Sequence, residues 1–426
     1  MKWLTGTTTE VLAALNDTVQ LAQEDNQQVE EQVRQIIQQV IKDGDQALKT
    51  YSKKFDHVEL QDLSISKEAI DLGFQRVEKE VITALEAAKE NIISYHKKQK
   101  QYDFMDMEKS GVLRGQLVLP LARVGVYVPG GTAAYPSSVL MNVLPAKIAG
   151  VQEVIMVTPP SAEGISDVIL AAAKIAGVDQ IFQIGGAQGI AALAYGTESV
   201  PKVDKIVGPG NIYVATAKKQ VFGMVGIDMI AGPSEIGILA DEAANPTYIA
   251  ADLLSQAEHD TLARVILVTD SVELAKQVEQ EIYLQLETLP RKEIAEKAIQ
   301  NHGMIIIASS LEAMFTIMNE IAPEHLEVQL VDAISYLHEI KNAGSIFLGE
   351  YASEPVGDYF SGTNHVLPTS GTAKFYSPLG VYDFVKYSQV TYYTKEALRE
   401  AKDAIALLAR KEGLEAHARA VECRFE

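Results

Sequence analysis

The sequence predicts an α/β fold built from two doubly wound parallel-sheet units, with helical segments at both ends of the chain. Three observations support this fold class. From about residue 117 to residue 349, short β-branched strings alternate with Ala-rich helical strings, as in βα units whose parallel strands are buried on both faces. Long amphipathic patterns precede this region, and a segment rich in Ala, Lys and Glu follows it.

The order of these strings divides the chain into parts. Residues 25–104 contain runs such as VEEQVRQIIQQVIKDGDQALKTYSKKF, whose apolar spacing predicts packed amphipathic helices. The βα strings run from RVGVYVPGG to IDMIAGPSEIGILAD and resume from TYIAADLLSQAEH to SIFLG, so we place a boundary near residue 237. We expect a helical arm at 1–24, one Rossmann-like domain formed by 25–123 plus 238–380, a second at 124–237, and a helical C-terminal segment at 381–426.

Composition limits the possible functions. The chain has 426 residues and a formal net charge of -20, which argues against nucleic-acid binding because that relies on clustered Lys and Arg. No stretch approaches the roughly 18 apolar residues of a membrane span, and the opening MKWLTGTTTEVL has no apolar signal core. We therefore expect a soluble, cytoplasmic protein that binds neither nucleic acid nor membrane.

The single cysteine, Cys423, lies three residues from the end of the chain. It excludes an internal disulfide framework and any zinc or iron–sulfur site built from cysteines. It also argues against a catalytic thiolate, so acyl chemistry through a thioester is not expected.

Glycines cluster where the predicted strands end. Gly130 and Gly131 follow VYVP, Gly185 and Gly186 follow FQI, Gly208 and Gly210 follow KIV, and Gly232 follows MIA. Ligands of open α/β sheets bind at the carboxyl ends of strands, and free N–H groups at a helix start suit an anionic phosphate. Such turns also use glycine for tight geometry alone. GPGNIY lacks the last glycine of G-x-G-x-x-G, so a dinucleotide would bind here without the standard signature.

Polar residues outside the packing pattern form candidate sites. Gln256 and His259 lie three apart on a predicted helix, so their side chains share one face roughly 5–6 Å apart and could meet at a metal ion. A solvated helix end is the alternative. Asp358 and His365 lie in a glycine-studded loop just past a strand, the kind of loop that often carries function.

Glu412 and His417 lie five apart near the C-terminus, which is not one helical face. A shared local role for the two would require a bend. Taken alone, each of the histidines near a carboxylate or an amide is more often a hydrogen-bonded bystander than a ligand or a base.

The stretch APEHLE places Glu324 and His325 side by side after a proline. They could lie in a surface loop without a function. Alternatively, they could be two groups that exchange protons with one substrate, since an imidazole titrates near neutral pH.

A set of motifs along the whole chain resembles the histidinol dehydrogenase family, in the family's order and near its length. The motifs are RVGVYVPGGTAAYPSSVLMNVLPAKIAGV, IGGAQGIAALAYGT, VDKIVGPGNIYVATAKKQV, AGPSEI, LLSQAEHD, APEHLE, GDYFSGTNHVLPT and EGLEAHARAV. The resemblance implies two successive NAD-dependent oxidations of L-histidinol through histidinal to L-histidine, the last steps of histidine biosynthesis. It also implies one Zn²⁺ per subunit and a homodimer with shared active sites.

The resemblance assigns roles to individual residues. The implied zinc ligands are Gln256, His259, Asp358 and His417, with His417 expected from the second subunit. Glu324 and His325 match the acid–base pair. The other implied substrate contacts are Ser234, His365 and Glu412, and the implied NAD contacts are Tyr127, Gln188 and Asn211. Zinc and substrate then belong to the domain formed by 25–123 plus 238–380, and NAD belongs to 124–237, while 381–426 reaches across the dimer.

The chemistry suits these residue types. Two imidazoles, an amide and one carboxylate leave Zn²⁺ with net positive charge to accept the nitrogens of histidinol. His325 is expected to take the alcohol proton. Without a cysteine to form a thiohemiacetal, water must add to the aldehyde, with Glu324 as its activator.

Two other classes of protein compete with this interpretation. A zinc hydrolase could use the same His, Asp and Glu set but would not need the glycine turns. A non-enzymatic nucleotide-binding module would keep the turns without turnover or bound zinc.

Overall fold

The computed structural model describes residues 1–21, 27–130, 135–230 and 232–426. The chain forms two compact units. Unit 1 comprises Met1–Gln99 and Ala122–Phe384, and unit 2 comprises Lys100–Leu121 and Val385–Glu426. Unit 1 contains two parallel sheets, which confirms the predicted α/β class.

The first sheet of unit 1 has the strand order β6-β5-β4-β7-β8, and all its neighbours are parallel. The chain enters the sheet at the central strand β4, adds β5 and β6 on one side, and then adds β7 and β8 on the other side. The strand order therefore reverses between β4 and β7, which is the switch point of the sheet. The strands are β4 (Arg123–Tyr127), β5 (Glu153–Thr158), β6 (Gln180–Gln183), β7 (Lys205–Val207) and β8 (Gly226–Ile227). The crossover helices are α5 (Pro136–Ala149), α6 (Asp167–Ala176), α7 (Gly186–Tyr195) and α8 (Ile212–Val221).

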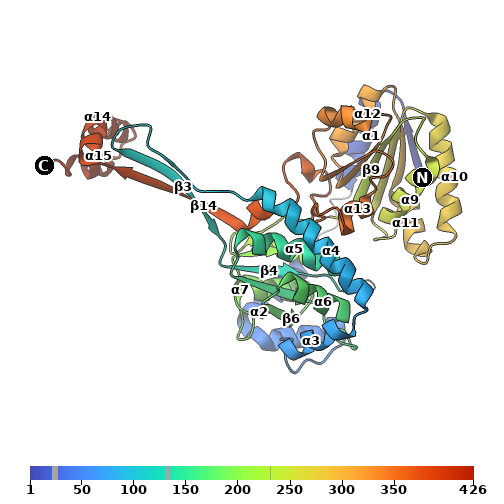
Figure 1. Ribbon diagram of the computed structural model, residues 1–426, viewed down its shortest axis with the longest axis horizontal. Coiled ribbons are helices and arrows are strands. Elements are labelled where there is room, and N and C mark those ends of the chain that lie inside the picture. The colour runs from blue at the N-terminus through green and yellow to red at the C-terminus, as the bar shows by residue number, and fades with distance from the viewer. Residues whose placement is uncertain (22–26, 131–134, 231) are drawn as a thin grey trace. The chain divides into compact units, whose positions relative to one another are not determined.

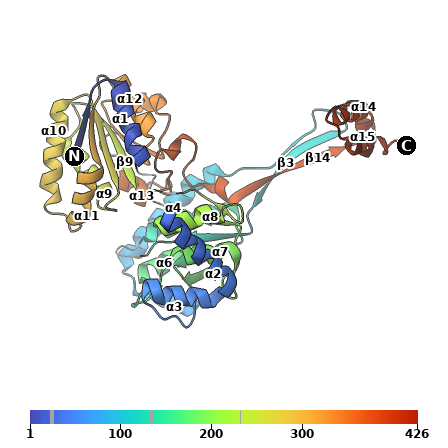
Figure 2. The same cartoon turned by 180° about the vertical axis from the view of Figure 1, so that it is seen from behind.

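The N-terminal amphipathic helices cover this first sheet. Helices α2 (Gln27–Tyr51), α3 (Lys67–Arg76) and α4 (Lys79–His96) pack on α5 to α8, and Figure 2 shows α2 beside α7 and α8. One core cluster joins Val33 and Leu48 of α2 to Phe182 of β6 and Leu193 of α7. The expected grouping of 25–123 with 238–380 is therefore corrected. The apolar stripes of these helices are buried against the sheet that follows them directly in the sequence.

The second sheet has the order β1-β11-β10-β9-β12-β13 and is also parallel. Helices α9, α10 and α11 cover one face, and α1 and α12 cover the other (Figure 1). The strands are β1 (Lys2–Thr5), β9 (Glu235–Ala240), β10 (Arg264–Thr269), β11 (Gly303–Ile307), β12 (His325–Gln329) and β13 (Ser345–Leu348). The helices are α1 (Thr8–Leu21), α9 (Pro246–Ala257), α10 (Val272–Leu286), α11 (Lys292–His302), α12 (Leu311–Ile321) and α13 (Glu354–Tyr359).

Two boundaries differ from expectation. The arm 1–24 begins with a strand, because residues 2–5 pair with β11 at the edge of the second sheet. IDMIAGPSEIGILAD is not one strand. It contributes the end of β8 to the first sheet and β9 to the second, so the chain passes between sheets within 228–234 rather than near 237.

Unit 2 is a small antiparallel sheet with a helical hairpin. The sheet has the order β14-β3-β2, formed by β2 (Phe104–Asp106), β3 (Val112–Pro120) and β14 (Val385–Tyr393). Helices α14 (Lys395–Lys411) and α15 (Glu415–Glu422) follow. The segment 381–426 is therefore not entirely helical, because the period-2 stretch KYSQVTYY pairs with β3.

Short helical turns complete the connections of the chain. They are a π-helical turn at Ser52–Asp56 and 3₁₀ turns at Lys97–Gln99, Ala333–Glu339, Thr372–Lys374 and Val381–Phe384. Within the ranges given above, no helix has the length and apolar character needed to cross a bilayer.

Candidate active site

The pair Glu324–His325 is buried, which excludes an idle surface loop. His325 is the first residue of β12 and is 3% exposed, and Glu324 directly precedes it at 7%. The main chain of Glu235, the first residue of β9, holds both side chains. Its N–H donates to Oε2 of Glu324 at 2.9 Å, and its carbonyl oxygen lies 3.2 Å from Nδ1 of His325. Pairing between β9 and β12 thus fixes the acid and the imidazole together.

The contact with Glu235 sets the tautomer of His325. A carbonyl oxygen can only accept, so Nδ1 carries a proton, and the protonation of Nε2 decides whether the ring is neutral or charged. Nε2 is buried, lies 3.4 Å from Oδ1 of Asp358, and makes no hydrogen bond of good geometry within the described ranges. In the neutral ring, this nitrogen could take a proton from a substrate.

Burial and neighbouring charges perturb both groups. Burial raises the pKa of Glu324 to about 8. Burial alone would lower the pKa of His325, but the carboxylates of Glu324 and Asp358 outweigh it and raise that pKa to about 10. The pKa of Asp358 is lowered, because its contacts with His325 and His365 outweigh its burial. Such opposed shifts in one cluster are typical of functional sites.

Glu354 and Asp358 lie one turn apart on α13, with Glu354 deeper. Oε2 of Glu354 accepts from Oγ of Ser255 at 3.0 Å, and its main-chain N–H donates to Glu327 at 2.8 Å. Burial raises the pKa of Glu354 to about 8 and that of Glu327 to about 9. Ligand atoms of His325, Glu354 and Asp358 all lie within 4.8 Å of one another, close enough to hold a metal ion.

His259 adjoins this cluster, and Gln256 precedes it by three residues. Gln256 is buried in the last turn of α9, whereas His259 lies two residues beyond the helix, with its N–H bonded to the Gln256 carbonyl at 3.2 Å. The expectation that both share one helical face is corrected: the chain leaves the helix in a turn. The charges of Asp358 and His325 act on His259, and burial lowers its pKa, which favours the neutral imidazole.

These residues fit a bound cation. Oε1 of Gln256 is buried and has no hydrogen-bond partner in the described part of the chain. An unsatisfied buried amide oxygen is costly. A neutral imidazole, an amide oxygen and an ionised carboxylate are suitable zinc donors, and Gln256, His259 and Asp358 supply one of each.

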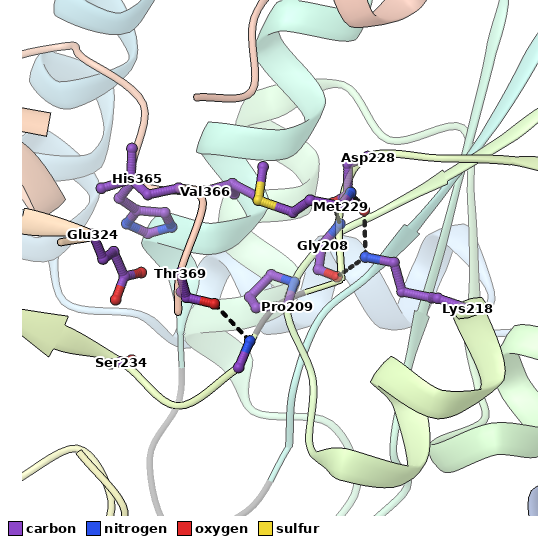
Figure 3. Close-up of a pocket in the computed structure, with 12 residues that line it drawn as sticks. Gly208, Pro209, Lys218, Asp228, Met229, Ser234, Glu324, His365, Val366 and Thr369 are labelled. Atoms are coloured by element: carbon purple, nitrogen blue, oxygen red, sulfur yellow. Dashed lines mark hydrogen bonds and ion pairs between the residues drawn. The ribbon is translucent and has the colours of Figure 1, made fainter. Parts of the chain in front are cut away.

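A cavity brings residues of both sheets together. Figure 3 shows Glu324, His365 and Thr369 on one side and the turn at Gly208 and Pro209 on the other. Ser234, directly before β9, also lines this cavity.

His365 is anchored at both ring nitrogens. Nδ1 lies 3.1 Å from the main-chain oxygen of Asp358, and Nε2 lies 3.2 Å from Oγ of Ser138 in the first turn of α5. Burial lowers the pKa of His365, which favours its neutral form.

The three expected nucleotide residues lie near the carboxyl ends of first-sheet strands. Tyr127 ends β4, and its hydroxyl accepts from the N–H of Gly186 at 3.1 Å. Gln188 is buried in α7. Asn211 caps α8 and accepts from the N–H groups of Tyr213 and Val214. Of the expected glycines, Gly131 lies outside the described residues.

Glu412 and His417 belong to unit 2. Glu412 follows the last residue of α14, His417 lies on α15, and both side chains are exposed. Gly413, with φ 78°, makes the bend between the two helices that a common role for these residues requires.

Sequence reasoning missed three features near the candidate site, which are Glu354, the main chain of Glu235 and the buried pair Lys218–Asp228. Glu354 could have been found, because it precedes Asp358 by four positions and so shares its helical face. Glu235 could not, since its role comes from its main chain. The buried pair Lys218–Asp228 left no signal either, because its two residues come from separate elements.

Two parallel sheets that bring a buried Glu–His pair, candidate metal ligands and glycine turns together are the arrangement expected of an α/β enzyme. A histidinol dehydrogenase family model matches residues 19–425. The histidinol dehydrogenase of Listeria monocytogenes serovar 1/2a is 63% identical over 429 residues, covering 100% of this chain and 99% of that protein. That of Streptococcus mutans serotype c is 61% identical over 425 residues, with 100% and 99% covered.

A solved structure agrees with these relatives. The crystal structure of histidinol dehydrogenase from Elizabethkingia anophelis has a TM-score of 0.91 at 36% identity, covering 100% of this chain and 98% of that one. The chain belongs to the histidinol dehydrogenase family, a family of NAD-dependent oxidoreductases. The resemblance drawn from its sequence motifs is confirmed.

Proposed function

We propose that this chain oxidises L-histidinol to L-histidinaldehyde and then to L-histidine, with NAD⁺ as the oxidant in both steps. The observation that carries this proposal is the placement of His325: Nδ1 is tied to the main chain of Glu235, and Nε2 is buried 3.4 Å from Asp358 without a hydrogen bond of good geometry in the described ranges. A cation held by Asp358 would offset part of the charge that raises the pKa of His325, which would favour the neutral ring that a base requires. Family membership favours this activity over a zinc hydrolase or a non-enzymatic nucleotide-binding module.

The first oxidation moves a proton and a hydride from the alcohol. Nε2 of His325 takes the hydroxyl proton while the hydride leaves the carbon for the nicotinamide ring. A positioned base of this kind contributes roughly 10² to 10⁴ in rate. The main-chain oxygen of Glu235 supports the imidazolium that forms, because Nδ1–H remains bonded to it.

The second oxidation requires water. After His325 has released the alcohol proton to solvent and a second NAD⁺ has replaced NADH, Glu324 removes a proton from water as its oxygen adds to the aldehyde carbon. The resulting tetrahedral anion gives its hydride to NAD⁺ and its remaining hydroxyl proton to His325, which leaves the carboxylate. No thioester is involved: Cys423, the only cysteine, is exposed in unit 2. Because burial raises the pKa of Glu324 to about 8, this carboxyl group can take up and release a proton near neutral pH beside the imidazole of His325.

Zinc would be held by Gln256, His259 and Asp358, with His417 supplied by a second subunit. When bound, the metal would fix the imidazole and amino nitrogens of histidinol. Asp358 is shared with the alternative cluster of His325, Glu354 and Asp358. We favour the set with Gln256, because it gives its unsatisfied oxygen a partner and leaves His325 free as a base.

The remaining site residues are assigned to substrate or to NAD. Ser234, His365 and Glu412 would contact the substrate, and Tyr127, Gln188 and Asn211 would contact NAD at the carboxyl edge of the first sheet. Because Glu412 and His417 belong to the exposed hairpin of unit 2, we propose a homodimer in which this hairpin completes the partner's site. The enzyme is proposed to act in the cytoplasm.

The test is NADH formation at 340 nm by zinc-loaded protein with histidinol and NAD⁺. We expect two NADH and one histidine per histidinol. One NADH per histidinol with accumulated aldehyde would contradict the second step, and no NADH would contradict the proposal as a whole.

A further inference from the structure

The buried pair Lys218–Asp228 has no part in the chemistry proposed above. Their side chains are 3% and 1% exposed, and they form an ion pair. Lys218 lies on α8, and Asp228 follows β8. Ionised groups this deeply buried are rare and need close partners.

Both members of the pair bind the same glycine. Nζ of Lys218 donates to the carbonyl oxygen of Gly208 at 3.0 Å, and Oδ2 of Asp228 accepts from its N–H at 2.8 Å (Figure 3). Both peptide planes that flank Gly208 are therefore fixed.

Gly208 has little freedom to adapt. Its φ is +108°, and a Cβ at this position would lie 2.2 Å from the main-chain oxygen of Tyr127. The Gly208 turn therefore packs closely against the main chain at the end of β4, and its hydrogen bonds to Lys218 and Asp228 hold it in this position. Asn211, three residues on, starts α8 and is an expected NAD contact.

The location favours a role in nucleotide binding. Gly208 follows β7 and Tyr127 ends β4, and these two strands flank the switch point of the first sheet, where open α/β sheets bind nucleotides. Gly208, Lys218 and Asp228 line the same cavity as Glu324 and His365.

We propose that Lys218 and Asp228 are positioning residues for NAD, which set the Gly208 turn so that Asn211 and the start of α8 meet the dinucleotide. This inference rests on the proposed NAD-dependent function. The two residues act through the turn and do not touch the nucleotide, because each charge is occupied by the other and by Gly208.

The experiment compares Lys218→Met, Asp228→Asn and the double variant, each loaded with zinc. We expect KM for NAD⁺ to rise at least about tenfold in both single variants, since small misplacements of binding groups have effects up to about 10²-fold. KM for histidinol and zinc content should stay unchanged. The double variant should be no worse than the worse single variant, because the two residues act as one unit.

Lys205→Met is the matched control. Lys205 begins the same strand β7, at the end away from the turn, and pairs with Asp383 at 3.0 Å. Removing this lysine makes the same change in charge and should leave KM for NAD⁺ unchanged.

Other outcomes would overturn the inference. A rise in KM for Lys218→Met but not for Asp228→Asn would show direct contact between Lys218 and the nucleotide. Parallel losses for NAD⁺ and histidinol would show a general structural role. If Lys218→Met fails to fold, the inference is tested with Asp228→Asn and with the double variant. The double variant removes both charges and so leaves no unpaired charge buried.

The readout can be separated from the proposed function. NADH affinity measured by fluorescence titration needs no histidinol turnover. If wild-type protein binds NADH but does not oxidise histidinol, the proposed function fails, while weaker NADH binding by both single variants would still support the positioning role.

Discussion

The main-chain oxygen of Glu235 lies 3.2 Å from Nδ1 of His325, and the N–H of the same residue bonds to Glu324. One residue at the start of β9 thus orients both proton carriers at the start of β12. The side chain of Glu235 is itself anchored, by Arg264 at 2.9 Å and by the N–H of Ser370 at 2.8 Å.

His325→Asn should reduce kcat roughly 10²- to 10⁴-fold for both oxidations, because Nε2 is the proton acceptor in each. Steady-state kinetics with histidinol and with histidinal measure the effect. Zinc content, determined by metal analysis, should not change. Loss of zinc in this variant would instead support His325 as a ligand, alongside Glu354 and Asp358.

Glu324→Gln should slow histidinal oxidation more than histidinol oxidation, because only the second step needs an activated water. Separate assays from the alcohol and from the aldehyde give the two rates. Equal losses would refute the water-activating role.

The same variant should flatten the pH dependence of stability. The pKa of Glu324 is about 8 in the folded state against 4.5 for the free group. The favourable contribution is therefore complete below about pH 4.5. Stability is lost progressively as pH rises from about 4.5 to about 8, because the unfolded group ionises before the buried one, and the loss levels off once the buried carboxyl ionises. Melting temperatures of metal-free protein from pH 5 to 9 should fall less for Glu324→Gln than for wild type. Glu312→Gln, which alters an exposed carboxylate of α12, is the control.

Gln256→Leu should weaken zinc binding without lowering the melting temperature of the metal-free protein. It removes a metal donor and also an oxygen whose unmet hydrogen bond costs about 1–3 kcal/mol. Titration of zinc against a competing chelator, together with thermal melts in excess chelator, checks both parts. Unchanged zinc affinity would remove Gln256 from the metal site.

Mixed dimers test the shared site. His259→Ala and His417→Ala should each be inactive alone, yet mixing them should restore activity, because one site of each heterodimer then has both histidines. Activity after co-refolding of the two chains gives the answer. Mixing His259→Ala with Asp358→Ala should restore nothing, because both residues belong to unit 1 of one chain.

The sequence predicted the fold class well where local pattern and tertiary packing agree. Strands such as Glu153–Thr158 and Arg264–Thr269 are continuous apolar runs buried on both faces, and they alternate with helices as expected. The packing partner of the amphipathic helices was not predictable in the same way. An apolar stripe shows that a helix is buried but not which sheet buries it.

The sequence named candidate site residues one by one but did not predict where in the fold they lie. The proposed nucleotide residues lie near the carboxyl ends of first-sheet strands, where the general rule places nucleotide sites. In the second sheet, Ser234, Glu324 and His325 gather at the amino ends of β9 and β12 instead. No local pattern encodes this, because it depends on which edge of one sheet faces the other.

The carboxyl edge of the second sheet is closed rather than open. Asp241, directly after β9, accepts from the N–H groups of Ala243 at 3.0 Å and Val331 at 2.9 Å. The residues proposed for the chemistry of the second sheet lie at the opposite edge, at the amino ends of β9 and β12. Coupling through a side chain introduced at Val331, which is 66% exposed while its main-chain N–H stays bonded to Asp241, therefore offers a route to immobilising the catalyst on a support away from the proposed site.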